Sequence, residues 1–350
     1  MTTYNGGLNS TGNMTGGDRT VVVDLVANGS APKLDPATVA NFLASLPTEL
    51  RSLTPTAVHI VAPGATIGLD VMAREGLAIL GSATLDLSSS HKADGSPVQL
   101  GVVATGGDKV LLNHGPSYAV SLNGHDTIVS SGGHDFLRSA LGSDSLVGGG
   151  QSHLVGGIDG NDTLVGGLTG AAQDTIASRG SSHIQVSFGS NLITAGAGDT
   201  IQAGHSSSTI YAADGAATIT GGSGTLVYGS GASSILAGGG QNNTFNLTGS
   251  DTLTAQRGSA VVNVDGGSQA SIHGGAGHLD VNLAGNTGND TLFGGSGGLT
   301  IHVSANVGAI VNDPNTLDAQ GYHVVQFASG ETLHVSNVTI DFGNGQHKTV

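Results

Sequence analysis

Acidic side chains recur at a fixed interval in the middle of this sequence. Four aspartates and one histidine lie nine residues apart, at Asp126, Asp135, Asp144, His153 and Asp162. A hydrophobic residue follows two positions after each of them, at Ile128, Leu137, Leu146, Val155 and Leu164. Hard cations such as Ca²⁺ bind preferentially to carboxylate and carbonyl oxygens. The spacing therefore predicts a series of acidic turns that could hold cations.

The hydrophobic repeat continues beyond the acids, and it predicts the elements that position them. Its later members lie about nine residues apart, at Ile201, Ile210, Ile219, Val227, Ile235, Phe245, Leu253, Val262, Ile272, Val281, Leu292 and Ile301. An amphipathic helix would repeat hydrophobic residues every three or four positions, which excludes it here. A short strand and a glycine turn fit the period, and two such units make one coil of a parallel β-solenoid, an all-β fold.

Proline divides the chain into three parts. Seven of the eight prolines precede residue 117, and the last is Pro314. Proline cannot donate a hydrogen bond to a strand ladder, so the long proline-free segment suits repeated strand pairing. We expect a β-rich N-terminal domain over residues 1–116 with one short helix over 36–46, a β-roll over 117–310, and C-terminal cap strands over 311–350.

Stacking of the coils would bring the acids together. Residues eighteen apart should lie on adjacent coils, with Asp126, Asp144 and Asp162 in one column and Asp135 with His153 in the opposite one. At a strand spacing of about 4.8 Å, two carboxylates repel by roughly 3 to 4 kcal/mol. A divalent cation between them reverses the sign of this energy. The alternative is that the aspartates accept backbone hydrogen bonds in turns, the interpretation we favour for Asp174 and Asp199.

Two segments carry a family resemblance. Residues 157–165, Gly-Ile-Asp-Gly-Asn-Asp-Thr-Leu-Val, and 285–293, Gly-Asn-Thr-Gly-Asn-Asp-Thr-Leu-Phe, resemble the nonapeptide of haemolysin-type (RTX) calcium-binding repeats. The resemblance implies a parallel β-roll with Ca²⁺ between turns and export by a type I pathway. The residues expected to form the metal sites are Asp126, Asp135, Asp144, Asp159, Asp162 and Asp290, with Gly124, Gly142, Gly160 and Gly288.

Composition excludes several kinds of function. The 350 residues include 60 glycines and no cysteine, so disulfides and thiolate metal sites are absent. A net charge of −15 opposes binding to nucleic acid, and no hydrophobic run is long enough to insert into a membrane. The G-x-S-x-G string at 294–298 lies in a repeat turn, without the strand-elbow-helix context of a serine hydrolase. His125 and His134 fall on opposite edges of a roll and should not share an ion.

These features predict a secreted, calcium-binding structural protein and not an enzyme. Its partners would be calcium ions, further copies of itself in a filament, surface layer or biofilm matrix, and a cell-surface or matrix polysaccharide. The first residues contain no classical export signal, so we expect a type I secretion signal near the C-terminus. One alternative is the repeat region of a secreted enzyme whose chemistry lies within residues 1–116. Another is an ice- or carbohydrate-binding solenoid.

Overall fold

The computed structural model is all-β in the part that it describes. It describes several short segments before residue 105, namely 23–26, 58–61, 66–67, 76–79, 84–88, 95 and 100–104. It then describes residues 106–350 except 133, 159–160, 213–216, 232, 238–240, 266–267, 285–287, 306 and 343. The helix expected over 36–46 lies outside these residues. None of the described segments is a helix that could cross a membrane.

The chain forms two compact units, residues 1–166 and 167–350. In the first unit, parallel pairing links the even-numbered strands from β2 to β12, with β1 beside β2, and the odd-numbered strands from β3 to β13 form a second parallel ladder. The strands are β1 (Val23–Val26), β2 (Val58–Val61), β3 (Thr66–Ile67), β4 (Gly76–Ile79), β5 (Thr84–Asp86), β6 (Leu100–Ala104), β7 (Lys109–Leu111), β8 (Ser117–Ser121), β9 (Thr127–Val129), β10 (Phe136–Ser139), β11 (Ser145–Val147), β12 (His153–Val155) and β13 (Thr163–Gly166).

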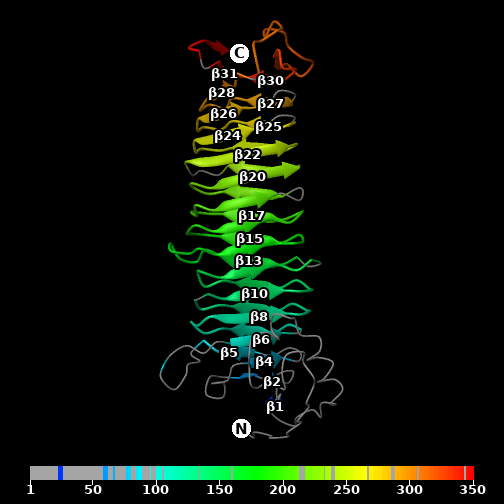
Figure 1. Cartoon of the computed structure of the whole chain (residues 1–350), viewed down its shortest axis with the longest axis vertical. Coiled ribbons are helices and arrows are strands. Elements are labelled where there is room, and N and C mark those ends of the chain that lie inside the picture. Colours follow the sequence, from blue (N-terminus) through cyan, green and yellow to red (C-terminus); the bar gives the residue numbers. More distant parts are fainter. Residues whose placement is uncertain are drawn as a thin grey trace. The chain divides into compact units, whose positions relative to one another are not determined.

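The second unit repeats this arrangement (Figure 1). Its coils comprise β14 (Thr175–Ala177), β15 (His183–Val186), β16 (Leu192–Thr194), β17 (Thr200–Ala203), β18 (Thr209–Ala212), β19 (Thr218–Gly221), β20 (Leu226–Gly231), β21 (Ser234–Ala237), β22 (Asn243–Gly249), β23 (Thr252–Ala255), β24 (Ala260–Val264), β25 (Ser271–His273), β26 (Leu279–Leu283), β27 (Asn289–Phe293) and β28 (Leu299–Val303). Alternate strands pair in parallel, so each unit is a parallel β-solenoid, as the sequence predicted.

Antiparallel strands follow the last coil of the second unit. The segments are β29 (His323–Gln326), β30 (Thr332–Ser336), β31 (Thr339–Asp341) and β32 (His347–Thr349). Strand β30 pairs in parallel with β27, and β31 pairs in parallel with β28. Strand β29 then pairs antiparallel with β30, and β32 pairs antiparallel with β31. The direction of the ladder therefore reverses at both sheets.

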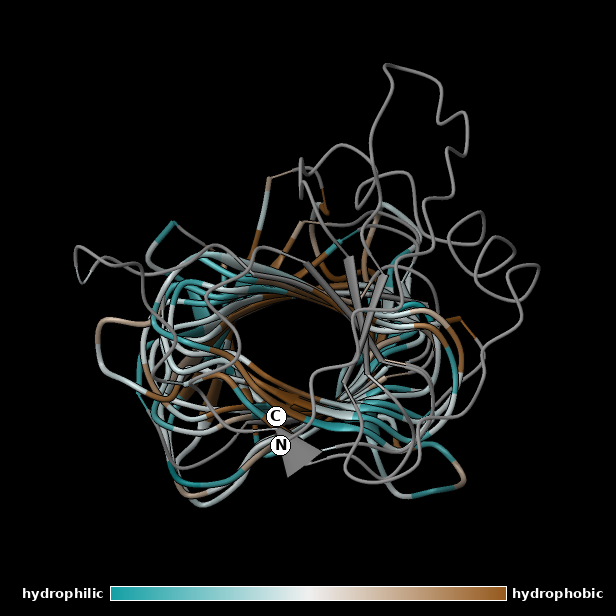
Figure 2. Cartoon of the chain, turned by 90° about the horizontal axis from the view of Figure 1, so that it is seen from below, coloured by the Kyte–Doolittle hydropathy of each residue, from teal (hydrophilic) through white to brown (hydrophobic). Residues whose placement is uncertain are grey.

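The core is made by the inward side chains of the strands, one on the shortest strands and up to three on longer ones such as β26, where Leu279, Val281 and Leu283 are buried. On β9, β11 and β13 the register aligns Ile128, Leu146 and Leu164, and all three are fully buried. Their neighbours on each strand point outward, because successive side chains of a strand face opposite sides. Each such buried side chain contributes roughly 1.5–3 kcal/mol of hydrophobic stabilisation. Seen end-on, hydrophobic residues concentrate on the strands and hydrophilic residues on the connecting turns (Figure 2).

Two details of the strand pairing were not evident from the nine-residue period. Strand β8 pairs with β6 just as it pairs with β10, so the described strands on both sides of residue 117 belong to one ladder. In addition, the register aligns Leu137 with Leu154, and not with Val155. This coil is one residue shorter than eighteen, which moves His153 out of the aspartate position.

Candidate functional site: the buried corners

The corner position is defined here as the residue two places before the inward hydrophobic residue of each strand. Asp126, Asp144 and Asp162 occupy it on β9, β11 and β13, and each is at most 2% exposed. The backbone N–H of Asp126 donates to Oδ1 of Asp144 at 2.8 Å, and the N–H of Asp144 donates to Oδ1 of Asp162 at 2.9 Å. The predicted column therefore exists, and each aspartate caps the strand of the preceding coil.

The second carboxylate oxygen in this column also has a donor. Ser121 Oγ donates to Oδ2 of Asp126 at 2.6 Å, and Ser139 Oγ donates to Oδ2 of Asp144 at 2.7 Å. At Asp162 the N–H of Gly157 takes this role at 2.7 Å. Donors from two directions thus solvate each buried carboxylate, which is the condition for burying a charge at tolerable cost.

The opposite edge of the first unit repeats the pattern at Asp135. Its Oδ1 accepts the N–H of Ser117 at 2.7 Å, and its Oδ2 accepts a hydrogen bond from Ser130 Oγ. The expected partner His153 is not in this column. Ser152 occupies the corner position and is buried, whereas His153 faces outward and packs edge-on against the ring of Phe136.

Residues outside the predicted set of metal-site residues also cap corners in the second unit. Asn191 accepts the N–H of Asp174, Asn243 accepts the N–H of Thr225, and Asp251 accepts the N–H of Ser233, at 2.8–3.0 Å. Asp199 accepts the N–H of Ser182 at 2.7 Å and that of Gly196 at 2.6 Å, which fits its predicted turn role. The sequence signal for these residues is their position two residues before a hydrophobic residue of the repeat, where asparagine can replace aspartate.

The predicted glycines allow neighbouring turns to stack closely. Gly124 and Gly142 have φ of +108° and +112°, a region that favours glycine. A Cβ on Gly124 would lie 2.6 Å from Cα of Gly106, and one on Gly142 would collide with the carbonyl oxygen of Gly124. These glycines are therefore required by backbone packing. Asp159 and Gly160 lie outside the described residues.

The corner at Asp290 contains a second buried acid, Glu331. Asp290 and Glu331 are each 1% exposed, and Oδ1 of Asp290 accepts the N–H of Ala270 at 2.7 Å. The N–H of Gly288 donates to Oε2 of Glu331 at 2.6 Å. The remaining oxygens, Oδ2 of Asp290 and Oε1 of Glu331, are buried without a hydrogen-bond partner in the described structure. Two acids thus share a buried corner with two unsatisfied oxygens.

Burial shifts four of the corner acids, Asp135, Asp144, Asp251 and Asp290, toward the protonated form. It raises the pKa of Asp135, Asp144 and Asp251, and hydrogen bonds from neighbouring backbone and hydroxyl groups partly oppose the shift. For Asp290, burial and the adjacent Glu331 raise the pKa to about 7. The physical cause is the loss of water around a charged group, reinforced here by a second acid.

The first-unit column does not fit a Ca²⁺ ion. Such an ion needs six to eight oxygens at about 2.3–2.6 Å, whereas the oxygens of Asp126, Asp144 and Asp162 are directed at N–H and O–H donors. Within the described part of the chain, no three His, Cys, Asp or Glu side chains form a group suited to a metal. The Asp290–Glu331 corner fits a cation better, because it has two buried oxygens that lack donors.

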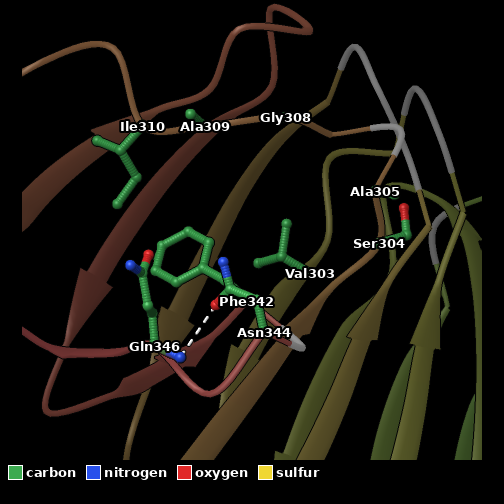
Figure 3. Close-up of a pocket in the computed structure, with 9 residues that line it drawn as sticks. All are labelled: Val303, Ser304, Ala305, Gly308, Ala309, Ile310, Phe342, Asn344 and Gln346. Carbon is green, nitrogen blue, oxygen red and sulfur yellow. Dashed lines mark hydrogen bonds between the residues drawn. The ribbon is translucent and has the colours of Figure 1, made fainter.

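A cavity of about 420 Å³ lies near the end of the second unit (Figure 3). Val303, Ile310 and Phe342 give it hydrophobic walls, and Asn344 and Gln346 add amide groups. Its lining also includes Ser304, whose buried Oγ has no partner in the described structure. The lining residues include neither histidine nor acid, so no neighbouring base among them could activate this hydroxyl.

Comparison with known proteins adds no assignment. No protein-family model, curated protein or solved structure matches this chain.

Proposed function

We propose that this chain is a structural protein of an extracellular surface or matrix, in which outward rows of the β-solenoid bind a partner of repeating structure. The observation that carries the proposal is a hydroxyl row in the second unit. Consecutive coils align Thr200 with Thr218, and then Thr252 with Ser271 and Thr291. Ser234 occupies the register position between the two groups. A polysaccharide with regularly spaced hydroxyl groups suits such a row.

The C-terminal strands bear on how copies could associate. An open parallel edge would invite coils of another molecule to add end to end. Strands β29 and β32 instead lie antiparallel on the last coil strands, and β32 is short and carries His347 and Lys348. Short edge strands with basic residues oppose edge pairing. Self-assembly through this end is therefore disfavoured, and lateral association through the sheet faces is the form we propose.

The calcium proposal is confined to Asp290 and Glu331. A cation there would supply the positive partner that the two buried oxygens lack. Calorimetric titration of the full chain with CaCl₂ tests this, with Asp290→Asn and Asp144→Asn as paired variants. We expect Asp290→Asn to abolish calcium binding and Asp144→Asn to leave it unchanged. The reverse result would move the site to the first-unit column. If neither the unmodified chain nor the variants release or absorb heat on titration, calcium is removed from the proposal.

Co-sedimentation with insoluble cellulose and chitin tests the function itself. The double variant Thr218→Lys/Thr252→Lys places charges at two exposed positions of the hydroxyl row, and Thr194→Lys is the matched control on the other sheet. We expect the chain and the control to sediment with polysaccharide and the double variant to lose at least tenfold in affinity. Absence of binding to any polysaccharide, together with a monodisperse monomer in light scattering at high concentration, would overturn the proposal.

The same row favours one second function, binding to ice. Regularly spaced threonine hydroxyls on a flat β-face could match an ordered water surface as well as a sugar polymer. Thermal hysteresis measured on the same three proteins separates the two. Hysteresis lost only in the double variant would replace the polysaccharide proposal with ice binding.

A further inference from the structure

Histidines and aspartates alternate across the outer surface of the second unit beside its last strands. The chain of contacts comprises His278, Asp280, His302, Asp341 and His347. Nε2 of His278 and Nε2 of His302 each lie 3.3 Å from Oδ1 of Asp280. Nδ1 of His302 lies 3.3 Å from Oδ2 of Asp341, and Nδ1 of His347 lies 3.7 Å from the other oxygen of Asp341.

Strand register places these residues side by side. His302 on β28 is aligned with Asp341 on β31, and Asp341 is aligned with His347 on β32. Asp280 comes from β26, the next strand on the other side of β28. The contacts therefore run from β26 across β28 to the hairpin formed by β31 and β32. His302 occupies the central place, with one carboxylate at each ring nitrogen.

The two contacts of His302 have a protonation requirement. A neutral imidazole has one N–H and one lone pair, whereas the imidazolium has two N–H groups. Both ring nitrogens of His302 face carboxylate oxygens at 3.3 Å. Only the imidazolium can donate to Asp280 and Asp341 together. In the neutral ring, one lone pair faces a carboxylate, and that contact becomes repulsive.

We propose that His302 is a proton-operated link that fastens the C-terminal hairpin β31–β32 to the last coils of the solenoid. Histidine is the side chain whose charge ordinarily changes between pH 5 and 8. Protonation of the imidazoles places three positive groups around the carboxylates of Asp280 and Asp341, and Lys348 lies on the adjacent strand β32. The link therefore strengthens as the pH falls, independently of the function proposed above.

The position of the hairpin gives the link a local consequence. The turn between β31 and β32 contains Phe342, Asn344 and Gln346, which form one wall of the 420 Å³ cavity (Figure 3). Val303, the residue after His302 on β28, also lines this cavity. Loosening of the hairpin would thus open this cavity on the side of the turn.

Hydrogen exchange of the full chain at pH 5.5 and pH 8.0, corrected for intrinsic rates, tests the proposal. The partly exposed contacts correspond to a modest stabilisation, so we expect the amides of β31 and β32 to exchange about two- to fivefold more slowly at pH 5.5. His302→Gln and Asp341→Asn should each abolish this difference. His205→Gln, which changes a surface histidine stacked on Phe188, should retain it.

The amides of β30 provide an internal reference, because the Asp290–Glu331 corner lies beside that strand and also responds to pH. A pH effect in β30 that persists in His302→Gln, while the effect in β31 and β32 disappears, supports the proposal. Equal protection of β31 and β32 at both pH values in the unmodified chain would overturn it. So would a pH effect on those strands that survives both His302→Gln and Asp341→Asn.

Discussion

Asp144 in the first unit and Asp290 in the second are both buried corner acids, but their surroundings differ. In the first unit, Asp144 is buried, but its Oδ1 accepts the N–H of Asp126 and its Oδ2 accepts Ser139 Oγ. In the second unit, Asp290 is equally buried, yet its Oδ2 and the neighbouring Oε1 of Glu331 lack donors. Hydrogen bonds to both oxygens of Asp144 partly offset the cost of burying this carboxylate. The second pair needs a proton or a cation.

The comparison shows that a repeat of aspartates does not by itself indicate a metal column. A carboxylate that caps the backbone N–H of the preceding coil occupies the same sequence position as a metal ligand would. What separates the two roles is the number of donors around the second oxygen. Ser121, Ser139 and Gly157 provide those donors in the first unit.

The largest expected effect is the pH dependence of the Asp290 corner. Because the folded-state pKa of Asp290 is raised to about 7 from 3.8, the native state binds the extra proton. Its contribution to stability is complete below about pH 4 and is lost as the pH rises through about 7, by up to about 4 kcal/mol. Urea unfolding followed by circular dichroism in calcium-free buffer measures this loss. Asp290→Asn should flatten the profile, and parallel profiles for the two proteins would refute the assignment.

The next effect in size concerns the satisfied column. Asp144→Ala removes the acceptor of the Asp126 N–H and of Ser139 Oγ, and should lower the free energy of unfolding by about 2 to 3 kcal/mol. Asp144→Asn keeps an oxygen for the N–H and removes a charge that burial disfavours, so its change should stay within about 1 kcal/mol. Equal losses in the two variants, measured by urea unfolding, would show that the charge itself is required.

The smallest effect tests the equivalence of asparagine and aspartate. Asn243 is 1% exposed, and its Oδ1 accepts the N–H of Thr225 at 2.9 Å. Asn243→Asp keeps this acceptor and adds a buried charge, so we expect a loss of about 1 kcal/mol at pH 7 that is recovered at pH 4. Thermal unfolding at the two pH values provides the measurement. A loss that persists in acid would mean that the amide group of Asn243 is itself required.

The fold was predictable because its signal is simple. One hydrophobic residue per nine, as at Ile128, Leu146 and Leu164, specifies an inward side chain on each short strand. The column of Asp126, Asp144 and Asp162 followed from the same period. The frame was wrong at His153 because the coil there is one residue shorter, and because both Leu154 and Val155 are hydrophobic, so the pattern does not reveal the shift.

The chemistry of the corners was less predictable. Asn191 and Asn243 were missed because a search for cation ligands selects acids, whereas the backbone N–H accepts either amide or carboxylate oxygen as a partner. Glu331 could not be found from the repeat, because it lies 41 residues after Asp290 in sequence and reaches the corner only through the pairing of β30 with β27. The donors that distinguish the two kinds of corner are backbone and serine groups without a sequence signature of their own.

The most direct test of the central claim is the unfolding free energy of the unmodified chain and of Asp144→Asn, each with EDTA and with millimolar CaCl₂. Hydrogen-bonded corners predict that calcium shifts both proteins equally, because the first-unit column takes no part in binding it. A calcium-dependent stabilisation that is present in the unmodified chain and lost in Asp144→Asn would contradict the account.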